Sequence, residues 1–159
     1  MNIIKITSPL TELVKGCPTI VLAGPKGTAD GGINWRGRVV VLLTAEEYEG
    51  NLVIPEWGNF RASCDPASIH DWHVRMNTKA DAILVWFAED SLESDFSQNI
   101  RDIMLIGANR GVLLIGCHPN APANIQSFVS RFTSDRQVKL YDNLDSLVDA
   151  GIHKLYQQM

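Results

Sequence analysis

Cysteine, positive charge and long apolar runs are all scarce in this 159-residue chain. The three cysteines are an odd number without metal-type spacing, so they predict reduced thiols in a cytoplasmic protein rather than a disulfide framework or a metal site. A net charge of −4 argues against an extended nucleic-acid partner, because such a partner needs a basic face. No apolar run approaches the roughly 20 residues of a membrane span, and the start lacks the apolar segment of a signal peptide. We therefore expect neither a membrane nor an extended nucleic acid as partner.

The glycine-rich loop Gly24–Gly32 lacks both familiar phosphate-binding patterns. It has no Lys-Ser/Thr pair at Walker spacing and no G-x-G-x-x-G fingerprint, so no cofactor is expected. Its glycines indicate either that the backbone passes close to another group or that the loop merely bends. The loop follows Thr19–Ala23, an apolar run typical of a buried parallel strand. Small molecules bind outside the carboxyl ends of such strands, near the point where the strand order reverses. This predicts a small-molecule site that holds a nucleoside or nucleotide.

The alternation of apolar strands and helical segments predicts one α/β domain over residues 1–159. Strands are expected at residues 19–23, 51–54, 82–87, 112–116 and 138–141, with residues 1–18 forming a leading strand or an extended arm. Helices are expected at residues 35–48, 69–79, 97 to about 107–111, 125–132 and 144–156. Right-handed crossovers then give a flavodoxin-like open five-stranded parallel sheet in the order 2-1-3-4-5, with helices on both faces.

Candidate binding residues cluster at the expected strand ends. Trp35 and Arg36 open the first helix, where an aromatic plane and a guanidinium suit stacking on a base and contacting a hydroxyl or phosphate. The alternative is a tryptophan that packs on a neighbouring loop. The predicted substrate-binding residues are Ala23, Gly24, Pro25, Trp35, Arg36, Trp57, Asp71 and Phe87.

Candidate catalytic residues fall in two further segments. His70, Asp71 and His73 fall within a stretch of four residues on one predicted helix and could work as acid and base. The two histidines do not predict a metal site, because no third ligand is recognisable. A solvated helix face with Trp72 turned inward is the alternative. Carboxylates follow the central strand, where they suit glycosyl transfer, or else they belong to a solvated acidic loop. They are Glu89, Asp90, Glu93, Asp95 and Asp102.

Several short motifs, taken in order, resemble the nucleoside 2-deoxyribosyltransferase family, especially its smaller "like" branch. They are Ala23-Gly24-Pro25, Trp35-Arg36, Val53-Ile54-Pro55, Trp72, Ala80-Asp81, Trp86-Phe87 and Gly116-Cys117-His118-Pro119, and the resemblance covers roughly residues 19–133. It implies the same five-stranded sheet. It also implies cleavage of a deoxynucleoside N-glycosidic bond by a glutamate nucleophile, which attacks C1′ from the helix after the Trp-Phe strand. A second acid then assists the leaving base.

The chain departs from the family pattern at that helix. Asn99 falls where the glutamate belongs, and a shifted alignment places Asp102 there, one turn deeper. His73 replaces the acidic residue that follows the helix tryptophan. Two hypotheses therefore stay open. One is an N-glycosyl transferase or N-glycosidase whose candidate catalytic residues are Asp102, Asn99, His73, Glu93 and Asp95. The other is a protein that binds, and so senses or sequesters, a nucleoside derivative.

The terminal helix raises a separate question about assembly. Family members complete each site with a neighbouring subunit, and the apolar segment Leu144–Tyr156 could contribute to a homo-oligomer. A monomer whose terminal helix covers the sheet is the alternative.

Overall fold

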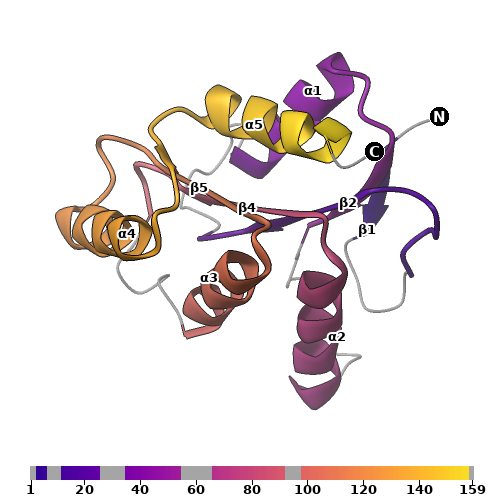
Figure 1. Cartoon of the computed structure of the whole chain (residues 1–159), viewed down its shortest axis with the longest axis horizontal. Helices are drawn as coiled ribbons and strands as arrows, with labels where there is room; N and C mark the ends of the chain where they lie inside the picture. The colour runs from indigo at the N-terminus through magenta and orange to yellow at the C-terminus, as the bar shows by residue number, and fades with distance from the viewer. Residues whose placement is uncertain (1–2, 7–11, 26–34, 55–65, 92–97, 158–159) are drawn as a thin grey trace.

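A six-stranded, all-parallel sheet organises the chain (Figure 1). The computed structural model describes residues 3–6, 12–25, 35–54, 66–91 and 98–157. The strands are β1 Ile3–Ile6, β2 Thr19–Ala23, β3 Gly50–Val53, β4 Ala82–Phe87, β5 Leu113–Cys117 and β6 Leu140–Tyr141. The helices are α1 Trp35–Ala45, α2 Pro66–Lys79, α3 Gln98–Arg110, α4 Ala123–Arg136 and α5 Leu144–Gln157. The class is therefore α/β with a parallel open sheet, as predicted.

The predicted count of five strands is wrong, and the order of the whole sheet differs because a leading strand, one of the two alternatives for residues 1–18, adds a sixth. The five predicted strands keep their predicted order 2-1-3-4-5 relative to one another. The sheet runs β1-β3-β2-β4-β5-β6, because Ile3–Ile6 pair in parallel with β3 on the side away from β2. A four-residue strand is too short to show a period in the sequence, and its place depends on the backbone groups that β3 leaves open. At the other edge, β6 is only two residues long, half of the segment expected to form it.

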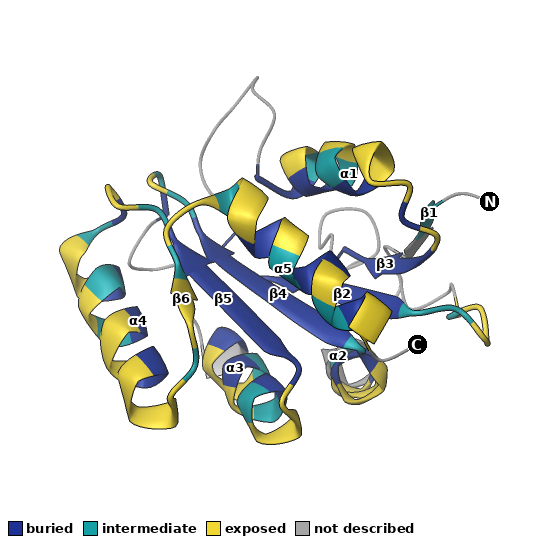
Figure 2. Cartoon of the chain, turned by 45° about the horizontal axis from the view of Figure 1, so that its top comes forward, coloured by how far each residue is buried: buried dark blue, intermediate teal, exposed yellow. Residues whose placement is uncertain are grey.

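Two apolar cores enclose the sheet, one on each face (Figure 2). Successive residues of a strand point to opposite faces, so β4 sends Ile83, Val85 and Phe87 to one core and Ala82, Leu84 and Trp86 to the other. Both sets are buried, which explains why this strand carries no polar residue. Helices α2, α3 and α4 cover the first face, and α1 and α5 cover the second. Helices on both faces were predicted and are confirmed.

A segment without regular structure, residues 12–18, crosses the amino ends of the strands. The side chain of Asn51, fully buried in β3, holds it: its Oδ1 accepts from Val14 N at 3.0 Å and its Nδ2 donates to Val14 O at 3.0 Å. The Tyr48 hydroxyl lies 3.0 Å from Pro18 O and 2.8 Å from Asn51 O. Burial raises the pKa of that hydroxyl, so it stays protonated as a donor. The side chains of Asn51 and Tyr48 therefore hold residues 12–18 in place by hydrogen bonds to their backbone.

No helix among the described residues is long and apolar enough to cross a membrane.

Candidate functional site

The strand order reverses between β2 and β4. Strand β2 pairs with β3 on one side and with β4 on the other, and the chain crosses over β2 to pass from β3 to β4. The carboxyl ends of β2 and β4 therefore flank the crevice in which open α/β sheets bind ligands. Ala23 pairs with Val85, and β4 continues to Phe87, so Gly24 emerges alongside the last residues of β4. This places Ala23, Gly24 and Pro25 at the reversal point.

Gly24 is glycine for two reasons. Its φ of +121° lies in a region that L side chains rarely adopt. A Cβ built on it would also lie 2.5 Å from the carbonyl oxygen of Trp86, well inside van der Waals contact. The backbone of the β2 exit therefore passes directly against β4, and the first explanation offered for the glycines, close approach of backbone, applies here to a neighbouring strand.

Trp35 and Arg36 direct their polar atoms at the β2 exit. The indole Nε1 of Trp35 donates to Pro25 O at 2.8 Å, and a terminal guanidinium nitrogen of Arg36 donates to Gly24 O at 3.1 Å. Both side chains are buried, and the Arg36 guanidinium lies 5.5 Å from the centre of the Trp35 ring. These are the contacts of a tryptophan packed on a neighbouring loop. They fix two successive carbonyls, while a contact of either side chain with a ligand stays a prediction.

The exits of β4 and β5 are joined by backbone. His118 N donates to Phe87 O at 2.8 Å, and Asn120 N donates to His118 Nδ1 at 3.0 Å. The Phe87 side chain is fully buried in the core on the face that α2, α3 and α4 cover. Only the backbone of Phe87 can therefore face the crevice. Hydrogen bonds therefore hold the exits of both strands that flank the reversal, β2 through Trp35 and Arg36 and β4 through His118.

Ser91 is a candidate site residue that sequence reasoning missed. It closes the turn after β4, where its N donates to Ala88 O at 3.1 Å. Its side chain is 2% exposed, and its Oγ has no hydrogen-bond partner in the described part of the chain. A buried hydroxyl without a partner is costly, so it marks a position where a ligand atom or water would be stabilised. A serine in an acidic loop gave no signal of this in the sequence.

The predicted acid and base residues are not gathered at the reversal point in the part described. Asp102 is exposed on α3 and Asp71 is exposed on α2, whereas His73 is half-buried beside Trp72, with ring centres 5.0 Å apart. Trp72 is buried against the sheet, as the solvated-face alternative expects. Asn99 lies in the first turn of α3, but its side chain is outside the described residues, as are Trp57, Glu93, Asp95 and the side chain of His70.

Metal binding gains no support from the described residues, which contain no group of three or more His, Cys, Asp or Glu side chains able to hold an ion. Arg101 of α3, two residues after Asn99, places its guanidinium carbon 5.1 Å from the centre of the Phe128 ring on α4. It therefore packs between helices.

Cys117 is predicted to be unreactive. It ends β5, is buried, and burial raises the pKa of its thiol to about 11. Because the thiolate is the nucleophile, alkylation of the native protein at pH 8 should modify half-exposed Cys17 and spare Cys117, as measured by peptide mass spectrometry. Since the folded pKa exceeds the ordinary value of 9.0, the stability contributed by the neutral thiol is present below pH 9 and is lost as pH rises towards 11. Alkylation of Cys117 at the rate of Cys17 would contradict this, with urea-unfolded protein as the control.

Comparison with known proteins adds no assignment: no protein-family model matches the chain, and no curated protein matches it either.

Proposed function

We propose that this protein binds a nucleoside or nucleotide at the carboxyl edge between β2 and β4 and cleaves or transfers its sugar at the N-glycosidic bond. The observation that carries the proposal is the fixed β2 exit at the strand reversal, where Arg36 and Trp35 hold the carbonyls of Gly24 and Pro25. A loop held in this way loses little entropy when a ligand binds. The order of short motifs along the chain supports a nucleoside as that ligand.

Glycosidic chemistry at this edge needs few groups. The bond between C1′ and the base nitrogen breaks, positive charge develops on the sugar, and water or an acceptor base bonds to C1′. The chemistry needs a carboxylate to stabilise that charge, for which Glu93, Asp95 and Asp102 are the candidates. It also needs an acid to protonate the leaving base and regain a proton from the attacking group, for which His73 and Asp71 are the candidates. The described part of the chain does not gather these residues at the reversal point.

A second function, ligand binding without turnover, is favoured by one residue. Asn99 stands where the family resemblance places the nucleophilic glutamate, and an amide cannot form a stable glycosyl ester. A protein that kept the crevice and lost the nucleophile would sense or sequester its ligand. Hydrolysis through an oxocarbenium-like state tolerates that loss better than covalent transfer does, so the two functions differ in turnover.

A panel of deoxynucleosides, their monophosphates and NAD, each with and without an acceptor base, tests the proposal by chromatography of the released base. We expect turnover that Asp102→Ala abolishes and Asn99→Ala leaves in place. Binding without turnover, with base exchange appearing only in Asn99→Glu, would instead establish the binding protein. If no variant binds or turns over any panel member, the nucleoside proposal is wrong.

A further inference from the structure

A second cleft lies at the opposite, amino-terminal edge of the sheet. It has a volume of about 450 Å³, within the range of small-molecule sites. One wall is the pinned segment of residues 12–17, and the other is the C-terminal half of α2, with Thr19 and Asp81 at the strand starts between them. Because β2 and β4 are parallel, this cleft and the crevice at their carboxyl ends are separated by the length of the sheet.

Hydrogen bonds within the protein hold both the segment of residues 12–17 and the strand starts in place without a ligand. Asn51 fixes Val14 through both of its backbone groups, and Thr19 N donates to Asp81 Oδ2 at 2.8 Å. The same asparagine donates to the Thr19 hydroxyl at 3.2 Å. Hydrogen bonds from β3 and from the start of β4 therefore set the distance between the segment and the sheet, and little ordering is left for a ligand to impose.

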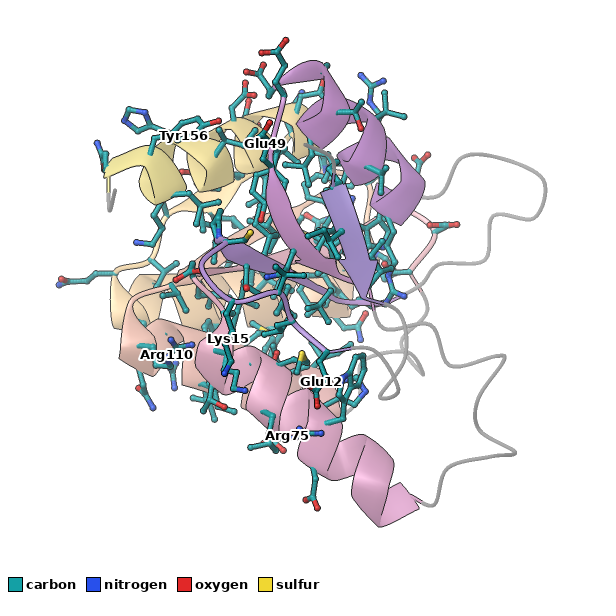
Figure 3. The ribbon with its side chains drawn as sticks, turned by 90° about the vertical axis from the view of Figure 1, so that its right-hand side faces the viewer. Glu12, Lys15, Glu49, Arg75, Arg110 and Tyr156 are labelled. Carbon is teal, nitrogen blue, oxygen red and sulfur yellow. The ribbon has the colours of Figure 1, made fainter. Side chains whose placement is uncertain are left out.

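The lining combines an apolar floor with a cationic rim. The floor open to a ligand is formed by Leu13 and by Val14, which is 45% exposed, while Trp72 and Met76 of α2 lie buried beneath it. Three cations, Lys15, Arg75 and Lys79, line it together with two carboxylates, Glu12 and Asp81. Figure 3 shows Glu12 and Lys15 of the segment beside Arg75 of α2 on this edge of the molecule. Among the lining residues that the structure describes, positive charge is thus in excess, in a chain whose net charge is −4.

The described cations of the cleft do not form ion pairs with its carboxylates. None of the three cations has a carboxylate at ion-pair distance in the described part of the chain. Asp81 already accepts the Thr19 amide, which occupies part of its capacity. Lys79 also lies in the last turn of α2, where the helix dipole favours a cation. The dipole does not account for Arg75 one turn earlier, or for Lys15 on the facing segment.

From these observations we infer that the amino-edge cleft binds an organic anion, with a phosphate or carboxylate held by Lys15, Arg75 and Lys79 and an apolar body against the floor of Leu13 and Val14. Arginine matches the two oxygens of such groups with paired donors, and lysine adds a point charge. This site is independent of the nucleoside crevice and does not rest on its function.

Titration of the ¹⁵N-labelled protein with phenyl phosphate and phenylacetate tests the site, with benzyl alcohol and inorganic phosphate as partial probes. We expect saturable shifts confined to residues 12–19 and 72–81, an affinity that falls as salt is added, and weaker binding of both partial probes. Arg75→Gln should weaken phenyl phosphate binding about fivefold to tenfold, whereas Arg131→Gln, an exposed arginine on α4, should leave it unchanged. The exposed positions of both arginines make each variant safe for folding, which circular dichroism checks.

Three outcomes overturn the inference: no saturable binding, equal weakening by Arg75→Gln and Arg131→Gln, or inorganic phosphate binding as tightly as phenyl phosphate. The first two make the cations ordinary surface charge, and the third removes the apolar floor from the site. Shifts from a nucleoside fall at Gly24, Phe87 and Ser91 if the carboxyl-edge crevice binds it, so the two sites fail or succeed separately.

Discussion

Gly24→Ala is expected to lower the free energy of unfolding by about 3 kcal/mol or more. The residue has a φ of +121°, so alanine is strained there in any surroundings. The new Cβ would also meet the Trp86 carbonyl oxygen at 2.5 Å. That atom belongs to the backbone of a central strand paired on both sides, and it cannot move without breaking the β2–β4 or β4–β5 pairing.

Urea unfolding of Gly24→Ala beside Gly111→Ala measures this directly. Gly111 has a φ of +70° but no atom within 4 Å of its Cβ position, so alanine there costs only the backbone strain, about 1 kcal/mol. The difference between the two variants isolates the close approach of β2 to β4. Equal destabilisation would mean that the backbone at Trp86 can shift to make room for the new Cβ, so that β2 and β4 are not fixed in close contact at Gly24.

The interior of the sheet could be predicted from the sequence because burial on both faces leaves a run with no polar residue. Ala82–Phe87 is the clearest case, and its predicted bounds agree with the strand. The edges could not be predicted so well. β1 forms only where β3 offers free backbone groups, and β6 shrinks to Leu140–Tyr141 because it has a single neighbour. Pairing partners, rather than local pattern, decide such strands.

The candidate site divides in a similar way. The position of Gly24 at a strand end is legible in the sequence, because an apolar run stops there. The hydrogen-bond partners of Trp35 and Arg36 could not be predicted from the sequence. A guanidinium can bind a ligand or a backbone carbonyl, and only the path of the chain decides which. The amino-edge cleft depends on Asn51 binding a segment 37 residues away. A single asparagine in a strand gives no sign of that contact.

Arg36→Met is expected to lower the free energy of unfolding by about 2 kcal/mol and to weaken any ligand bound at the β2 exit. Methionine keeps an apolar side chain of similar length at this buried position and loses the bond to Gly24 O. A hydrogen bond from a charged donor contributes about 1.5–3 kcal/mol, and leaving the carbonyl buried without it costs a similar amount. Removing a buried charge recovers part of that loss, so the net effect lies towards the lower end.

Arg38 of the same helix provides the matched control. It forms an exposed ion pair with Asp145 at 3.3 Å, and both side chains are about half accessible to water. Exposed pairs contribute about 0–1 kcal/mol, so Arg38→Gln should scarcely change urea unfolding. The contrast between two arginines two residues apart, one directed at a carbonyl beneath the crevice and the other at solvent, tests whether the β2 exit is held from α1. If Arg36→Met proves as mild as Arg38→Gln, the Arg36 bond does not hold the Gly24 carbonyl, and the observation that carries the proposed function is reduced to the bond from Trp35 to Pro25 O.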